Sequence, residues 1–286
     1  MKYLEKNKLY LVTGGTGFLG QKLVSRLIKK GIKLRVIARN EGKLIELKQE
    51  FPSIEIYTGD MSDPFEAHQA CQGVSGVFHL AAYKFVDLAE KFSRECVQSN
   101  VTASFNVLEE SLRNKFDFVV GISTDKAAQV SGVYGATKYL MESLFRQYEK
   151  LNPETKYRIV RYGNVLYSTG SVLCKWKKLL QEGKEVIVTD LNATRFFWTK
   201  DEAVQLVFDC IEYATSSDPY VPQMKSMDIK SLLNAMAKKY LPAGSKLNMK
   251  IIGIQQGENL HEKILENGKY SNEVERFTVE EIVEKI

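Results

Sequence analysis

A glycine-rich turn near the start of the chain limits the possible folds more than any other feature. The apolar residues 9–13 predict a buried strand, and glycines follow at positions 14, 17 and 20. Apolar side chains at positions 23, 24, 27 and 28 then predict an amphipathic helix that ends at Gly31. Glycines let such a turn tighten and let the backbone approach a pyrophosphate, while the helix N-terminus offers N–H donors. The order of strand, glycine turn and helix therefore predicts a dinucleotide-binding site.

Residues at the ends of the next predicted strands are further candidate contacts of this dinucleotide. Arg39 ends the strand at 34–38, where a guanidinium suits the 2′-phosphate of NADP; a solvated loop charge is the alternative. Asp60, after the strand at 54–57, is placed to meet the adenine or to serve as an ordinary turn residue. We expect NADP as the cofactor, with NAD as the second choice. The expected cofactor contacts are Gly14, Thr16, Gly17, Phe18, Leu19, Arg39, Asp60, Met61, Ala81, Ala82, Lys84, Tyr134 and Lys138.

Predicted strands and helices alternate along the chain through residue 162. Such alternation predicts an α/β fold with a Rossmann-type doubly wound parallel sheet. After residue 162 the pattern loosens, and the prolines at 219, 222 and 242 predict breaks. We therefore expect a dinucleotide-binding Rossmann domain at residues 1–165 with a returning segment at about 196–225, and a smaller C-terminal substrate lobe made of residues 166–195 and 226–286.

The chemistry is expected at the end of the apolar strand 118–122, which we expect to finish at Ser123. Ligands of an open α/β sheet sit beyond the carboxyl ends of its strands. Thr124, Asp125 and Lys126 should therefore emerge where a ligand lies, although Asp125 and Lys126 could also form a surface ion pair in a turn. His79 lies within an apolar strand, so we interpret it as structural rather than as a general base.

A predicted helix at 133–148 carries a second candidate pair. Tyr134 and Lys138 are four residues apart, so they share one face of this helix. A neighbouring ammonium lowers the pKa of a phenol, which would let Tyr134 accept a proton near neutral pH. An ordinary tyrosine and lysine on a surface helix are the alternative.

Composition excludes several classes of protein. The net charge is +5, and its 40 Lys and Arg are spread along the chain, which argues against nucleic-acid binding and suits an anionic small ligand. The four cysteines are far apart, so neither a metal site nor a disulfide framework is expected, and a reducing cytoplasm is favoured. No apolar run approaches about 18 residues, and no signal core follows the first residues, so we expect no membrane span.

Several short motifs resemble those of the extended short-chain dehydrogenase/reductase superfamily. More narrowly, the chain resembles the soluble UDP-N-acetylglucosamine 4,6-dehydratases of bacterial polysaccharide and glycan biosynthesis. The motifs are Ser-Thr-Asp-Lys-Ala at 123–127, Tyr-Gly-Ala-Thr-Lys at 134–138, Arg-Tyr-Gly-Asn-Val at 161–165 and Thr-Arg-Phe at 194–196. The resemblance covers nearly the whole chain. A departure after Ala82, where the chain reads Tyr-Lys-Phe-Val, leaves the sugar and the C5 configuration of the product open.

The resemblance implies a reaction in three steps on a bound UDP-hexose. Tyr134, aided by Lys138, takes the O4 proton while hydride leaves C4 for the nicotinamide, and Thr124 bonds to the sugar O4. Lys126 then removes the C5 proton and Asp125 protonates the leaving C6 hydroxyl, after which hydride returns to C6. Burial must move the pKa of Lys126 down and that of Asp125 up for these roles.

The same resemblance implies the substrate contacts and the assembly. Asn164 and Arg195 should hold the diphosphate region of the UDP-sugar, and Arg161 is a weaker candidate because strand arginines are often structural. The expected substrate contacts are Lys84, Asn164, Thr189 and Arg195. Helices at 90–113 and 133–150 carry apolar residues on more than one face, so we expect a homo-oligomer. A UDP-hexose 4-epimerase and a non-catalytic NADP-binding regulatory protein remain alternatives.

Overall fold

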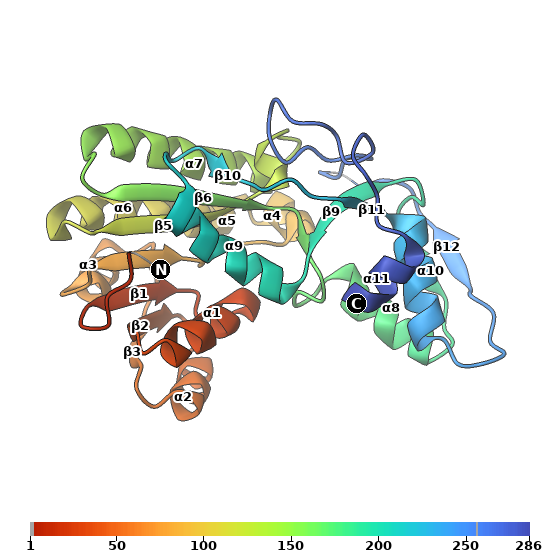
Figure 1. Ribbon diagram of the computed structural model, residues 1–286, viewed down its shortest axis with the longest axis horizontal. Coiled ribbons are helices and arrows are strands. Elements are labelled where there is room, and N and C mark those ends of the chain that lie inside the picture. Colours follow the sequence, from red (N-terminus) through yellow and green to blue (C-terminus); the bar gives the residue numbers. More distant parts are fainter. Residues whose placement is uncertain (1–2, 256) are drawn as a thin grey trace.

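Seven parallel strands form the central sheet of the computed structural model, which describes residues 3–255 and 257–286 (Figure 1). The order across the sheet is β10-β6-β5-β4-β1-β2-β3. The chain runs outward from β1 to β3 and then returns to β4 on the other side of β1. This reversal between β1 and β4 marks the point at which doubly wound folds bind ligands. The strands are β1 (Leu9–Thr13), β2 (Lys33–Ala38), β3 (Glu55–Thr58), β4 (Gly76–His79), β5 (Phe118–Thr124), β6 (Lys156–Tyr162) and β10 (Pro219–Tyr220).

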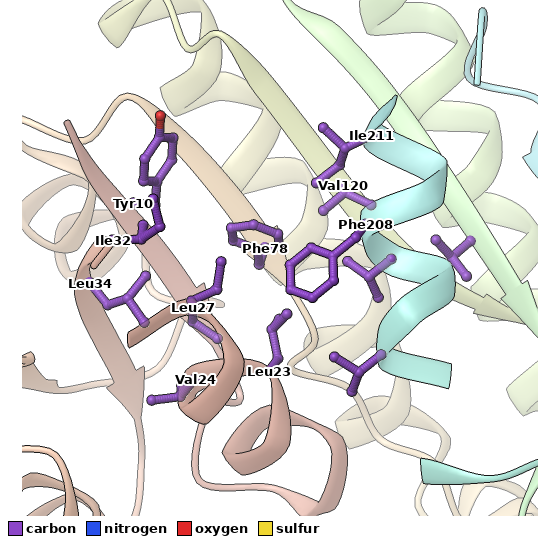
Figure 2. Close-up of a cluster of buried hydrophobic side chains, with 14 of the residues drawn as sticks. Tyr10, Leu23, Val24, Leu27, Ile32, Leu34, Phe78, Val120, Phe208 and Ile211 are labelled. Atoms are coloured by element: carbon purple, nitrogen blue, oxygen red, sulfur yellow. The ribbon is translucent and has the colours of Figure 1, made fainter. Parts of the chain in front are cut away.

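Helices cover both faces of the sheet because successive strand side chains point to opposite faces. On one face Tyr10 and Val12 pack with α1 (Phe18–Lys29), α2 (Glu41–Glu50) and α9 (Lys200–Tyr213). Figure 2 shows side chains of this layer, among them Tyr10, Leu27, Phe78 and Phe208.

On the opposite face Leu11, between Tyr10 and Val12, packs with a second set of helices. These are α3 (Pro64–Cys71), α6 (Ala103–Asn114) and α7 (Val133–Leu151). The sheet is therefore buried on both sides, as the apolar strands of the sequence predict.

Some details of the strands differ from the prediction. The strand β5 runs to Thr124 rather than stopping at Ser123, so Thr124 keeps extended backbone before the short 3₁₀ turn η2 (Asp125–Ala127). Pro219, expected as a break, opens β10. Proline is tolerated there because β10 is an edge strand, where a missing N–H disrupts no central ladder.

The predicted helical stretch at 90–113 is divided. It contains α4 (Val86–Lys91), α5 (Ser93–Val97), a wider π-helical turn η1 (Gln98–Thr102) and then α6. The wide turn brings Asn100, which is fully buried, toward the end of β4.

A smaller lobe lies beyond the strand ends, drawn from green at α8 to blue at α10 and α11 in Figure 1. Its core joins Trp176, Leu180, Phe197, Met227 and Leu232. The elements are α8 (Val172–Gln181), α10 (Ile229–Tyr240), α11 (Val279–Lys285), a three-stranded sheet of β11 (Ser226–Asp228), β9 (Thr194–Trp198) and β7 (Asn164–Val165), and a pair formed by β8 (Val186–Val188) and β12 (Met249–Ile251).

Residues 257–278, here called the C-terminal loop, connect β12 to α11 and run alongside the lobe sheet. Isolated bridges join Thr194 to His261 and Ser226 to Arg276. Within residues 3–255 and 257–286, no helix combines the length and the apolar character needed to cross a membrane.

Candidate active site

The glycine turn is shaped by close backbone contacts. Gly14 has a φ of +67°, which side chains rarely adopt, and a Cβ there would lie 2.7 Å from the backbone nitrogen of Ala81. Gly17 is the N-cap of α1, Thr16 precedes it, and Phe18 and Leu19 begin the first turn of this helix. No side chain of the described chain caps this helix, and its first turn contains no acidic residue. The backbone N–H groups at the start of α1 therefore suit the pyrophosphate of a dinucleotide.

Arg39 and Asp60 come together at the ends of β2 and β3. Arg39 Nη1 lies 3.5 Å from Asp60 Oδ2, and both side chains are exposed. Asp60 Oδ1 also accepts a hydrogen bond from the backbone N–H of Ser62 at 2.9 Å, and Met61 beside it is buried. The pair offers a guanidinium to a phosphate and a carboxylate to a hydroxyl within one small area.

His79 is structural, as the sequence indicates. It is buried, and its ring nitrogens contact Thr13 Oγ1 at 2.9 Å and Ser104 Oγ at 3.0 Å. Burial, with a smaller effect from Lys138, lowers the pKa of His79 to about 3. The ring therefore stays neutral and ties β4 to β1, and Thr13 Oγ1 in turn accepts from the backbone N–H of Ala81 at 3.0 Å.

Asn100 fixes the segment that follows β4, a role the sequence did not suggest. Its Oδ1 accepts from the backbone N–H of Tyr83 at 2.7 Å, and its Nδ2 donates to the Tyr83 carbonyl and to Thr137 Oγ1, both at 3.0 Å. The buried amide thus links the Ala81–Ala82 segment to α7. The π-helical turn η1 places Asn100 in this position. This turn is visible only in the structure, so the sequence did not indicate the role of Asn100.

The predicted catalytic residues meet at the end of β5. Thr124 Oγ1 donates to Asp125 Oδ1 at 2.9 Å, and Lys126 Nζ lies 3.2 Å from the same oxygen. Asp125 is almost completely buried, and its Oδ2 has no hydrogen-bond partner within the described chain. Buried polar atoms without partners are uncommon in proteins, so this oxygen is available to a ligand.

The start of α7 packs directly onto this turn. A Cβ at Gly135 would overlap the carbonyl oxygen of Lys126, so glycine allows the close approach. Glu90 Oε1 accepts from the backbone N–H of Val133 at 2.7 Å and holds the first turn of α7. Tyr134 is thereby placed beside the end of β5, near Thr124.

The expected effect of Lys138 on Tyr134 is not seen. Lys138 Nζ donates to the Ile122 carbonyl at 2.7 Å, and burial lowers the pKa of Lys138 to about 8. Burial raises the pKa of Tyr134 above its usual value, the Asp125 charge adds to this, and only a hydrogen bond with Thr124 opposes it. The pKa of Tyr134 is therefore set mainly by desolvation of the phenolate, with no lowering by Lys138.

Lys126 also differs from its prediction, because a partner missed in the sequence stabilises its charge. Glu262 of the C-terminal loop, 136 residues further along, places Oε1 2.8 Å from Lys126 Nζ. Burial alone would lower the pKa of Lys126, but Asp125 and Glu262 together raise it. The structure thus holds an ammonium where the sequence predicted a neutral amine.

The two candidate arginines are both buried. Arg195 Nη1 donates to the Thr194 and Leu260 carbonyls, each at 2.9 Å, and its Nε lies 3.8 Å from Glu262 Oε1. Its guanidinium faces the C-terminal loop in the structure, so its expected role as an open phosphate clamp stays a prediction.

Arg161 is completely buried and forms two bonds with Glu142, from Nε at 3.0 Å and from Nη2 at 2.6 Å. It also donates to the Ile264 carbonyl and to Glu266 of the C-terminal loop. Arg161 is therefore an ion-pair partner inside the protein, which is the alternative that its strand position favours.

The remaining substrate candidates lie around the lobe. Lys84 Nζ donates to the Thr169 carbonyl at 2.9 Å, joining the segment after β4 to the loop after β7, and burial lowers its pKa. Asn164 is exposed on β7, which pairs with β9 beside Arg195. Thr189 follows β8 and is partly exposed. No contact joins Thr189 to the catalytic residues among the hydrogen bonds of residues 3–255 and 257–286.

Comparison with known proteins agrees with this geometry. Residues 10–283 match the model of a family described as polysaccharide biosynthesis protein. The chain belongs to this family. It is similar to a UDP-N-acetylglucosamine 4,6-dehydratase (inverting) of Campylobacter jejuni, with 35% identity over 89% of this chain and 76% of the relative. An uncharacterized membrane protein of Methanocaldococcus jannaschii is 37% identical over 91% of this chain and 81% of its own length. A UDP-glucose 4-epimerase of Rickettsia canadensis is 32% identical over 91% and 78%.

Solved structures confirm the fold. The X-ray structure of Pen from Bacillus thuringiensis has a TM-score of 0.90 and 26% identity, covering 99% of this chain and 97% of that one. The structure of DesIV, a dTDP-glucose 4,6-dehydratase from Streptomyces venezuelae with NAD and TYD bound, has a TM-score of 0.80 at 17% identity, covering 97% and 95%. The predicted Rossmann-type sheet and the resemblance to extended short-chain dehydrogenases/reductases are both confirmed.

Proposed function

We propose that this chain is a nucleotide-sugar 4,6-dehydratase. It converts UDP-N-acetylglucosamine to a UDP-4-keto-6-deoxy-hexosamine by internal hydride transfer and loss of water. The observation that carries the proposal is the Asp125–Lys126 pair at the carboxyl end of β5, beside Tyr134, in which Asp125 is buried and Lys126 is partly buried. Elimination of water needs an acid and a base in addition to the tyrosine, and this pair supplies both.

The glycine turn and the uncapped start of α1 suit a bound nicotinamide dinucleotide. When bound, the nicotinamide would store the hydride between its removal from C4 and its return to C6. NADP is the cofactor that Arg39 favours, because an exposed guanidinium at the end of β2 can bind a 2′-phosphate. Asp60 beside it could instead accept ribose hydroxyls, which keeps NAD as the second choice.

Each catalytic residue has a role that its position allows. Tyr134 takes the O4 proton. Lys138 does not lower the pKa of Tyr134 in the structure, but its ammonium, one helical turn away, would favour the phenolate once substrate and cofactor fill the site. Thr124, bonded to Asp125, orients O4. Once C4 is a ketone, the C5 proton is acidic, so Lys126 removes it while Asp125 protonates the C6 hydroxyl, which leaves as water.

The substrate contacts remain part of the same proposal. Asn164 is exposed beside the lobe sheet, and Lys84 lies on the segment that borders the dinucleotide. Arg195 would reach a phosphate only if its guanidinium turned away from the C-terminal loop. All four cysteines are unpaired, which fits a reducing compartment such as the cytoplasm.

Incubation with UDP-N-acetylglucosamine and NADP tests the proposal, with the products followed by mass. A dehydratase releases one water from each sugar nucleotide, and a keto carbon appears in the nuclear magnetic resonance spectrum. If the substrate mass stays unchanged while the spectrum shows a 4-epimer, the proposed function is wrong.

A UDP-hexose 4-epimerase is the second candidate, because a relative with that name is 32% identical over 91% of this chain. Epimerisation needs Tyr134, Lys138 and the cofactor but no further acid and base. Epimer formation that survives replacement of both Asp125 and Lys126 would favour it.

A further inference from the structure

Glu262 is a buried carboxylate that reaches the catalytic turn from outside the dinucleotide-binding half. It is completely buried, and its backbone N–H donates to Ser271 Oγ at 2.9 Å. Its Oε2 accepts from Asn259 Nδ2 at 3.2 Å, and its Oε1 lies 2.8 Å from Lys126 Nζ. Both carboxylate oxygens and the backbone N–H of Glu262 therefore have partners. Such pairing is needed because a buried charge without a partner costs much free energy.

Lys126 lies between two carboxylates. Its Nζ is 3.2 Å from Asp125 Oδ1 and 2.8 Å from Glu262 Oε1, so an ammonium keeps one of its three N–H groups for a ligand. Arg195 Nε, 3.8 Å from Glu262, balances part of the negative charge.

We propose that Glu262 is a positioning residue that orients the Lys126 amine toward the sugar C5 and makes this amine a stronger base. The proposal rests on the dehydratase function given above. Glu262 does this by stabilising the ammonium that forms as Lys126 takes the proton. The same negative charge also requires a higher pH before Lys126 is neutral.

The proton count of the cluster agrees with this role. Elimination needs a proton on Asp125 and a neutral amine at Lys126, so Lys126 must first give up the proton that its two carboxylate neighbours favour. The C5–H bond then breaks, its proton joins Lys126 Nζ, and its electron pair forms the C5–C6 double bond. The C6–O bond breaks, and its oxygen takes the Asp125 proton and leaves as water. The result is a carboxylate at Asp125 and an ammonium at Lys126, which Glu262 stabilises. When hydride returns to C6, C5 takes up a proton and Lys126 gives one up, so over the whole cycle the proton that Tyr134 takes from O4 replaces the one that left with water.

Other charged groups around Lys126 do not explain the same effect. Arg195 on β9 opposes an ammonium, and its effect on the pKa of Lys126 is smaller than those of Asp125 and Glu262. Tyr134 on α7 is neutral because burial raises its pKa. His261 is partly buried, and burial followed by Arg195 lowers its pKa, so it is neutral at pH 7. Glu262 is therefore the removable negative charge outside the acid–base pair itself.

The C-terminal loop provides a matched control. Glu266 lies four residues beyond Glu262 and also binds a buried cation of the sheet domain, with Oε1 2.9 Å from Arg161 Nη2. Glu266→Gln weakens the contact between this loop and the sheet without touching Lys126. A comparison of the two Gln variants separates an effect on the base from a general loosening of the loop.

The test is the pH dependence of kcat for water loss from UDP-N-acetylglucosamine, measured with the NADP-loaded enzyme. In Glu262→Gln the acid limb, where Lys126 must lose a proton, should move to lower pH by about 1–3 units, the usual effect of one neighbouring charge. The maximal kcat should also fall, since a weaker base removes the C5 proton more slowly. Glu266→Gln should keep the wild-type limb.

Glu262→Asp serves as a second variant if the Gln protein does not fold. It keeps the charge but withdraws the carboxylate by one methylene, so kcat should fall by about 10- to 100-fold through loss of orientation, with the acid limb unchanged. Three results would overturn the proposal. They are a wild-type kcat in Glu262→Asp, an acid limb of the pH profile at the wild-type position in Glu262→Gln, or equal shifts of this acid limb in Glu262→Gln and Glu266→Gln. Wild-type enzyme that releases no water contradicts the dehydratase function instead, so the two failures are distinguishable.

Discussion

Replacing Arg161 by Met should destabilise the protein by about 3–5 kcal/mol, the scale measured when one member of a buried ion pair is removed. Arg161 and Glu142 are both completely buried and share two bonds, at 2.6 and 3.0 Å. The Met side chain fills similar space but leaves the Glu142 charge with Ser123 Oγ as a close partner and with Arg146 at 3.8 Å. The cost therefore comes from the stranded carboxylate rather than from a cavity.

Urea unfolding of wild type, Arg161→Met and the double variant Arg161→Met/Glu142→Met measures this cost. Removing both charges also removes the stranded carboxylate, so the double variant should be more stable than the single one. A loss below about 1 kcal/mol in Arg161→Met, or a double variant that is the least stable of the three, would refute the reasoning.

Three further predictions concern the reaction, the cofactor and the assembly. In single turnovers, Lys126→Ala should still reduce the nicotinamide, but water should leave the substrate roughly 10²-fold more slowly or worse. Tyr134→Phe should show no absorbance of reduced cofactor. Water loss at the wild-type rate in Lys126→Ala contradicts the mechanism. Arg39→Asp should lower NADP affinity by about 10- to 100-fold in binding titrations with little change for NAD, and an unchanged preference would show that Arg39 does not read the phosphate. Phe105 and Leu140 are exposed on α6 and α7, so light scattering at micromolar concentration should find at least a dimer that Leu140→Glu weakens, and a monomeric wild type contradicts this.

The parts of the fold that the sequence predicted well are those that depend on neighbouring residues. The glycine turn, the strand Leu9–Thr13 and the start of the helix at Val133 follow from local periodicity and turn chemistry, and the structure has them at the predicted residues. The grouping of Thr124 with Asp125 and Lys126 follows from the rule that ligands lie at strand ends.

What the sequence could not predict depends on distant contacts. Glu262 lies 136 residues from Lys126 in a loop without periodicity, so no local pattern pairs them. Its charge adds to that of Asp125, and together they raise the pKa of Lys126, which is opposite to the expected direction. The predicted lowering of the Tyr134 pKa is not seen for a related reason. Spacing on a helix indicates proximity to Lys138, but it does not indicate how far burial desolvates the phenol.

The C-terminal loop also has a consequence for how the protein is made. Ribosomes release the chain from its amino end, so every strand of the central sheet, including β10 at residues 219–220, leaves the ribosome before Glu262 and Glu266. The nascent chain can therefore fold its dinucleotide-binding site while Lys126 and Arg161 still lack their carboxylate partners from this loop. Cofactor capture would precede completion of the acid–base centre, and Glu262, translated after the whole central sheet, would complete it.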